Sequence, residues 1–70
     1  MVGMDAMKSE WLRRIRSEYR EMPGMSLTKP QMRRLWRLDA RTCDVLVEHL
    51  VEAGFLSQTP SRRYVRATDH

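Results

Sequence analysis

Residues 27–56, LTKPQMRRLWRLDARTCDVLVEHLVEAGFL, decide the fold. Thr28 and Gln31 have the spacing of a capping box, in which each side chain bonds a backbone N–H at the start of a helix. Pro30 falls in the first turn, where no intrahelical N–H donor is needed. The sequence therefore predicts a helix that begins after Thr28 and runs to about Arg37.

The second half of this stretch predicts another helix close behind the first. Asp39 is a good N-cap, and Gly54 is typical of the position just past a helix end. Apolar residues recur between them at helical spacing, namely Cys43, Leu46, Val47, Leu50 and Val51. In the preceding helix we expect Met32, Leu35 and Trp36 to be buried. Two helices with so short a link, each with one apolar stripe, must pack at an angle, as in a helix-turn-helix.

The flanking residues add one helix before this pair and a hairpin after it. Residues 6–22 carry an apolar stripe at helical spacing, made of Met7, Trp11, Leu12, Ile15, Tyr19 and Met22. Pro23-Gly24 ends this helix, and a short extended segment follows. Residues 55–66 place turn formers between two β-favouring pairs, which is typical of a hairpin. We therefore expect a mainly α fold with three helices and a two-stranded wing over residues 6–66, with flexible ends at 1–5 and 67–70.

Length and composition indicate one small binding domain. The chain has 70 residues, a formal net charge of +4 and a single cysteine, Cys43. One cysteine forms no internal disulfide, which favours a cytoplasmic protein, and no apolar run is long enough to span a membrane. The sequence has no glycine-rich phosphate loop, no metal-ligand cluster and no nucleophile with a base partner. We expect neither an enzyme nor a protein that holds a cofactor or a metal ion.

The order of elements resembles a winged helix-turn-helix domain over residues 10–66. Residues 38–42 and 50–56 look like the starts of the third helix and of the hairpin in this superfamily. Residues 59–66 are similar to the wing of many bacterial transcription regulators, and residues 22–28 look like those of short bacterial proteins of this type. Many such wings turn through a glycine, whereas this chain has serine followed by arginine there.

The resemblance implies binding to duplex DNA and a role in transcription regulation. The third helix would enter the major groove with its N-terminal residues, and the wing would follow the DNA backbone or minor groove. The candidates for contact with base edges are Arg41, Thr42 and Val45. The candidates for contact with phosphates are Thr28, Lys29, Gln31, Arg33, Arg37, Arg62, Arg63 and Arg66. A homodimer through the first helix would cover both half-sites, with Trp11 and Tyr19 available for the contact.

The charge pattern supports this reading in part and leaves an alternative open. Residues 29–37 carry four cations and no carboxylate, and residues 62–66 carry three cations and no carboxylate. DNA binding requires these cations to converge on one continuous patch. The third helix also carries an acidic stripe, defined as Asp44, Glu48 and Glu52, which phosphates would repel. The stripe could pair with arginines of the first helix or of a second subunit. Alternatively, the protein is an interaction adaptor that docks a partner protein through the stripe.

Overall fold

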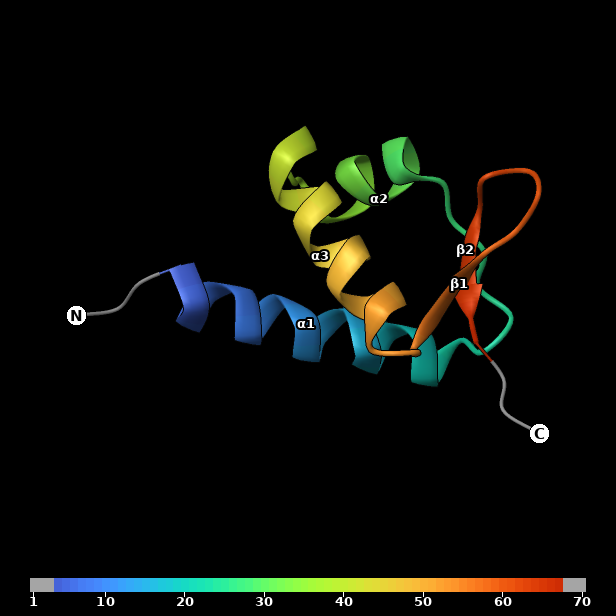
Figure 1. Cartoon of the computed structure of the whole chain (residues 1–70), viewed down its shortest axis with the longest axis horizontal. Helices are drawn as coiled ribbons and strands as arrows, with labels where there is room; N and C mark the ends of the chain where they lie inside the picture. Colours follow the sequence, from blue (N-terminus) through green and yellow to red (C-terminus); the bar gives the residue numbers. More distant parts are fainter. Residues whose placement is uncertain (1–3, 68–70) are drawn as a thin grey trace.

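Three helices precede a two-stranded antiparallel hairpin, as the sequence predicts (Figure 1). The computed structural model describes residues 4–67 of the chain. Its elements are α1 (Met4–Glu21), α2 (Lys29–Trp36), α3 (Ala40–Glu52), β1 (Leu56–Gln58) and β2 (Tyr64–Arg66). The expected flexible ends lie largely outside the described residues. Met4 and Asp5, however, already belong to α1, and the N–H of Ala67 donates to the carbonyl of Phe55.

The helix boundaries follow from local hydrogen bonds that the sequence predicts. The hydroxyl of Thr28 accepts from the N–H of Gln31 at 3.3 Å, and the Gln31 side chain accepts from the N–H of Thr28 at 2.8 Å. Asp39 caps α3 by accepting from the N–H of Thr42 at 3.2 Å. Hydrogen bonding from Thr42 holds the pKa of Asp39 below its usual value. Gly54, with a φ of 80°, takes the left-handed conformation that ends α3, so all of these expected caps are confirmed.

The core forms where α1, α2, α3 and the hairpin meet. Its buried apolar residues are Leu12, Ile15, Tyr19, Met32, Trp36, Cys43, Leu46, Val47, Leu50, Leu56 and Tyr64. Leu35 and Val51, which we expected to be buried, are 54% and 38% exposed. Leu35 directly precedes the buried Trp36, and Val51 directly follows the buried Leu50. Successive residues of a helix are rotated by about 100° around its axis, so both side chains point away from the core. The buried faces of α2 and α3 are therefore narrower than their apolar stripes.

Three residues of the apolar stripe predicted for the first helix, Met7, Tyr19 and Met22, differ from expectation. Met7 and Met22 belong to the predicted apolar stripe but are 59% and 58% exposed, because they lie beyond the ends of the core. Tyr19 is fully buried, so it is not available for contact with a second subunit as we had expected. Its hydroxyl donates to the backbone carbonyl of Tyr64 at 2.8 Å. This hydrogen bond ties α1 to the hairpin.

The extended segment after α1 lies beside the hairpin and fixes its position. Leu27 forms an antiparallel bridge to Tyr64, with N–H to carbonyl distances of 3.2 Å and 2.6 Å in the two directions. Within the hairpin, Ser57 pairs with Val65. The turn closes through a hydrogen bond of 2.9 Å from the N–H of Arg62 to the carbonyl of Thr59. Arg62 has a φ of 63° and thus occupies the left-handed position that glycine favours.

Candidate nucleic-acid interface

A groove forms where the start of α2 faces the hairpin. It has a volume of about 540 Å³ and is lined by Thr28, Lys29, Pro30, Gln58, Arg62 and Tyr64. The bridge between Leu27 and Tyr64 holds the two sides of this α2–hairpin groove together, because Leu27 directly precedes the cap of α2. Two cations that lie 33 residues apart in sequence, Lys29 and Arg62, therefore line one depression. An anion in the groove would contact both elements.

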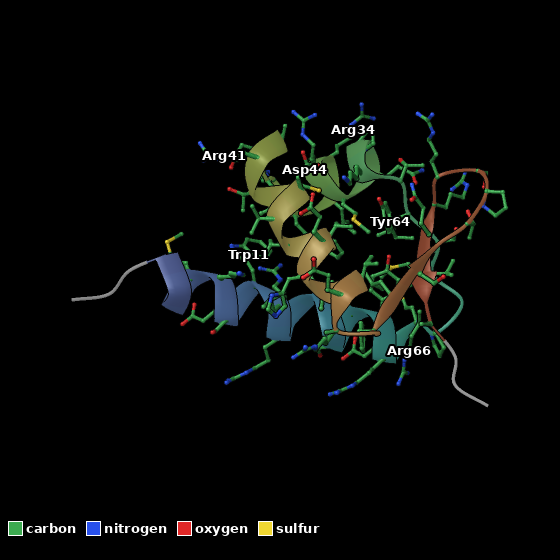
Figure 2. The ribbon with its side chains drawn as sticks, viewed as in Figure 1. Trp11, Arg34, Arg41, Asp44, Tyr64 and Arg66 are labelled. Atoms are coloured by element: carbon green, nitrogen blue, oxygen red, sulfur yellow. The ribbon has the colours of Figure 1, made fainter. Side chains whose placement is uncertain are left out.

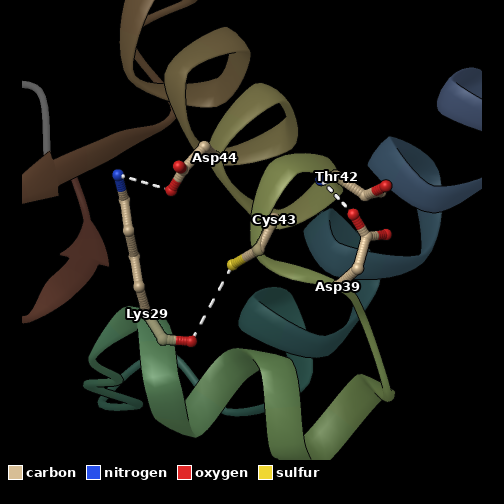
Figure 3. Close-up of polar contacts among 5 residues, drawn as sticks. All are labelled: Lys29, Asp39, Thr42, Cys43 and Asp44. Carbon is tan, nitrogen blue, oxygen red and sulfur yellow. Dashed lines mark hydrogen bonds and ion pairs between the residues drawn. The ribbon is translucent and has the colours of Figure 1, made fainter.

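Lys29 is already paired with one residue of the acidic stripe. Its Nζ lies 3.0 Å from Oδ1 of Asp44 (Figure 3). The same Nζ lies 5.9 Å from the centre of the Tyr64 ring. The hydrogen bond to Asp44 raises the pKa of Lys29. Pairing of the stripe with arginines of the first helix was one alternative that the sequence left open, and it is wrong for Asp44, whose partner belongs to α2. Both side chains remain partly exposed, so this pair contributes at most about 1 kcal/mol.

A weak sulfur contact also joins α3 to the first turn of α2. The Sγ of Cys43 donates to the carbonyl of Lys29 at 3.8 Å (Figure 3). Cys43 itself is buried in the core, and burial raises the pKa of its thiol. The contact helps to set the backbone of Lys29 against α3, next to Asp44. Cys43 therefore positions the edge of the α2–hairpin groove without lining it.

The three candidates for base contact, Arg41, Thr42 and Val45, lie together at the start of α3. They share a small apolar depression of about 120 Å³ with side chains of α1, among them Met7 and Trp11. Arg41 is exposed, and Val45 is partly exposed. The sequence does not predict that Trp11 and Met7 lie beside the start of α3, because no local pattern relates residues so far apart.

The arginines of α2, Arg33 and Arg34, are exposed. Arg34 and Arg41 lie along the same upper edge in Figure 2, although they belong to different helices. Arg33 and Arg34 line a shallow groove with Pro30 and Leu38. Arg37 ends α2 in the left-handed conformation, with a φ of 55°. This edge therefore gathers cations from α2 and from the start of α3.

Two of the candidate phosphate ligands, Thr28 and Gln31, already form hydrogen bonds that cap α2. The side chains of Thr28 and Gln31 are engaged in the capping box, and the backbone N–H groups of both residues are hydrogen-bonded within it. Fewer free amides remain at the start of α2 than the resemblance implies. A phosphate at this helix end would therefore depend mainly on Lys29 and Arg62.

The hairpin cations do not form the single continuous patch that we expected. Arg62 lines the α2–hairpin groove, and Arg63 points back to donate to the carbonyl of Ser26 at 3.4 Å. Arg66 instead lies at the lower edge of the molecule, across from Arg34 and Arg41 (Figure 2). Its guanidinium lies 5.4 Å from the centre of the Phe55 ring. Arg62 and Arg63 belong to the turn, whereas Arg66 ends β2 opposite Leu56, at the other end of the hairpin, and a count of charge along the chain does not register this separation.

Comparison with known proteins does not add to the description of the site. No protein-family model, no curated protein and no solved structure matches the chain. Within residues 4–67, no helix combines the length and apolar character needed to cross a membrane. Across the same described part of the chain, no three metal-binding side chains of histidine, cysteine, aspartate or glutamate come together.

Proposed function

We propose that the protein is a winged helix-turn-helix domain that binds duplex DNA and acts in transcription regulation. The observation that carries this proposal is the α2–hairpin groove, where Lys29 and Arg62 converge at the start of a helix. Two cations that face one depression are suited to a phosphate, because charge-assisted hydrogen bonds from both side chains can reach the same anion. The exposed Arg34 and Arg41 extend the same positive edge toward α3 (Figure 2).

In this proposal, α3 contacts bases through its first turns and the hairpin follows the backbone. Arg41 is exposed near the N-terminal end of α3, and a guanidinium there can bond guanine in a bidentate way. Phosphate contacts from α2 and Arg62 would set the register without reading sequence. One domain of this size covers roughly 600–1,000 Å² of protein surface, which suits a half-site. A homodimer remains part of the proposal, with Met7 rather than the buried Tyr19 exposed on α1 for the contact.

A second candidate function is an adaptor that docks a partner protein on the acidic stripe. The observation that favours it is the exposure of all three carboxylates on the outer face of α3. Only Asp44 has an ion-pair partner among the described residues, which leaves Glu48 and Glu52 open to a basic partner. The two functions make opposite predictions for the stripe, because its charge opposes DNA binding and would drive docking.

The test of DNA binding is the salt dependence of affinity for a random duplex. Each phosphate contact contributes a slope of about −0.9 to the plot of log K against log salt. Replacing Arg62 and Arg63 by alanine should flatten the slope by roughly 1–2 if both residues contact phosphates. Arg14→Ala is the matched control, because the Arg14 guanidinium lies over the Trp11 ring on α1, 5.2 Å from its centre. No measurable binding at low salt would contradict the proposal.

Removing the Asp44 carboxylate separates the two functions. Asp44→Asn frees the Lys29 ammonium and should raise DNA affinity up to about fivefold, the equivalent of roughly 1 kcal/mol for a partly exposed pair. Glu52→Gln, which breaks no ion pair seen among the described residues, serves as the control. Binding is measured by fluorescence anisotropy at fixed salt. A loss of DNA affinity in Asp44→Asn would contradict the placement of Lys29 at the phosphate, and loss of a protein complex would favour the adaptor.

A further inference from the structure

A second set of cations lies on α1, away from the α2–hairpin groove. Arg13, Arg16 and Arg20, called here the arginine row, are spaced three and four residues apart and so share one side of the helix. With Ser9, Leu12 and His49 of α3, they line a groove of about 390 Å³. No carboxylate lines this groove. The arginine row therefore presents positive charge to solvent along one side of the helix.

The ring of Phe55 connects the arginine row to Arg66 of the hairpin. The guanidinium of Arg16 lies 5.8 Å from the centre of the Phe55 ring, and that of Arg66 lies 5.4 Å from the same centre. Tyr19 holds the ring in place through an edge-to-face contact, with the ring centres 6.3 Å apart. A guanidinium stacked on an aromatic ring keeps its N–H groups at the edge free to bond an anion. Four arginines from two elements thus form one surface.

This surface carries an electrostatic cost that a polyanion would remove. Like charges one turn apart on a helix repel each other and destabilise the helix. Arg16 is three residues from Arg13 and four from Arg20, so it repels both. Among the described residues, the ion pair that forms is between Lys29 and Asp44, and none involves the arginine row or Arg66. A row of phosphates would pair with these guanidinium groups.

The lining favours DNA over an acidic protein as the occupant. Protein interfaces have an apolar centre, whereas DNA interfaces are more polar and far more positively charged. The groove exposes polar groups, since Leu12, its apolar member, is 7% exposed. The exposed large apolar residues of the described chain are Met7, Met22, Leu35, Val45 and Val51, and none of them lines the groove.

We propose that the arginine row and Arg66 bind a second DNA duplex, so that one protein chain joins two segments of DNA. This inference rests on the proposed function of the α2–hairpin groove. Arg66 lies at the opposite edge of the molecule from Arg34 and Arg41 (Figure 2), and the molecule measures 40 × 25 × 21 Å. The shortest of these dimensions exceeds the Debye length of about 8 Å at physiological salt, so salt screens the repulsion between two bound duplexes.

The test is capture of a fluorescent duplex by an immobilised duplex. The intact protein should bring the second duplex to the beads, and the yield should fall again at excess protein, when every duplex is separately saturated. In the variant with Arg13, Arg16 and Arg20 all changed to glutamine, the yield of captured duplex should fall at least about tenfold. The affinity of this variant for a single duplex should change by less than about threefold. Arg14→Gln is the control on the other side of α1, and circular dichroism verifies that each variant folds.

The outcomes separate the two proposals. Binding of a single duplex without capture of a second overturns this inference and leaves the proposed function intact, whereas no binding at low salt removes both. Capture that persists in the triple variant also overturns it, because a dimer with one DNA face per subunit would behave in this way. Binding of a polyglutamate peptide that the triple variant loses, with no capture by the intact protein, would show that the surface serves an acidic protein instead.

Discussion

Leu50→Ala is expected to lower the free energy of unfolding by about 2–5 kcal/mol, the usual cost of a leucine truncated in a core. Leu50 has no exposed surface and belongs to the core cluster formed by all three helices and the hairpin. A domain of this length has a total stability of roughly 3–10 kcal/mol, so the variant should lose a large fraction of its stability. Urea denaturation followed by the fluorescence of the buried Trp36 measures the change.

The neighbouring residue provides the control for this prediction. Val51 directly follows Leu50 on α3 and belongs to the same apolar stripe in the sequence, but it is 38% exposed. Val51→Ala should therefore cost less than about 1 kcal/mol. Equal losses in the two variants would mean that both side chains are buried in the same way, and the packing of α3 described here would then be wrong.

Alkaline pH is expected to destabilise the protein through Tyr19. Burial raises the pKa of Tyr19 from 10.0 to about 12. Between these two values the unfolded chain releases the phenol proton while the folded protein retains it, so stability is complete below pH 10 and declines as the pH rises to 12. Two pKa units correspond to about 2–3 kcal/mol. The free energy of unfolding, measured at intervals from pH 9 to 12, should fall by this amount.

The variant Tyr19→Phe isolates the contribution of the phenol. It removes the hydrogen bond to the Tyr64 carbonyl, which should cost roughly 1 kcal/mol at neutral pH. In both proteins the Lys29–Asp44 pair also loses its charge attraction as the pH rises through the raised pKa of Lys29. The difference between the two proteins therefore reports Tyr19 alone. If both lose stability equally up to pH 12, the Tyr19 hydroxyl is not buried as described here.

The candidate site was only partly predictable from the sequence. The start of α2 and the positive charge of the hairpin are both visible in the order of residues. Their meeting in one groove depends on the bridge between Leu27 and Tyr64, two residues that lie 37 positions apart. The arginines of α1 can also be identified in the sequence. That they form one surface with Arg66 depends on the Phe55 ring, which lies near both Arg16 and Arg66 in the folded protein. Charge counted along the chain therefore identifies the cations and does not assign them to a face.

The sequence by itself determined the helix starts and ends, the order of the elements and the position of the hairpin turn. These features depend on hydrogen bonds and backbone conformations within four or five residues, such as the capping box at Thr28 and the left-handed Gly54. The tertiary structure alone decided that Leu50 is buried beside an exposed Val51 and that Asp44 pairs with Lys29. It also decided that Arg62 lines the α2–hairpin groove while Arg66 lies against Phe55. Each of these depends on which distant element lies opposite the residue, and periodicity in a single element contains no information about its neighbours.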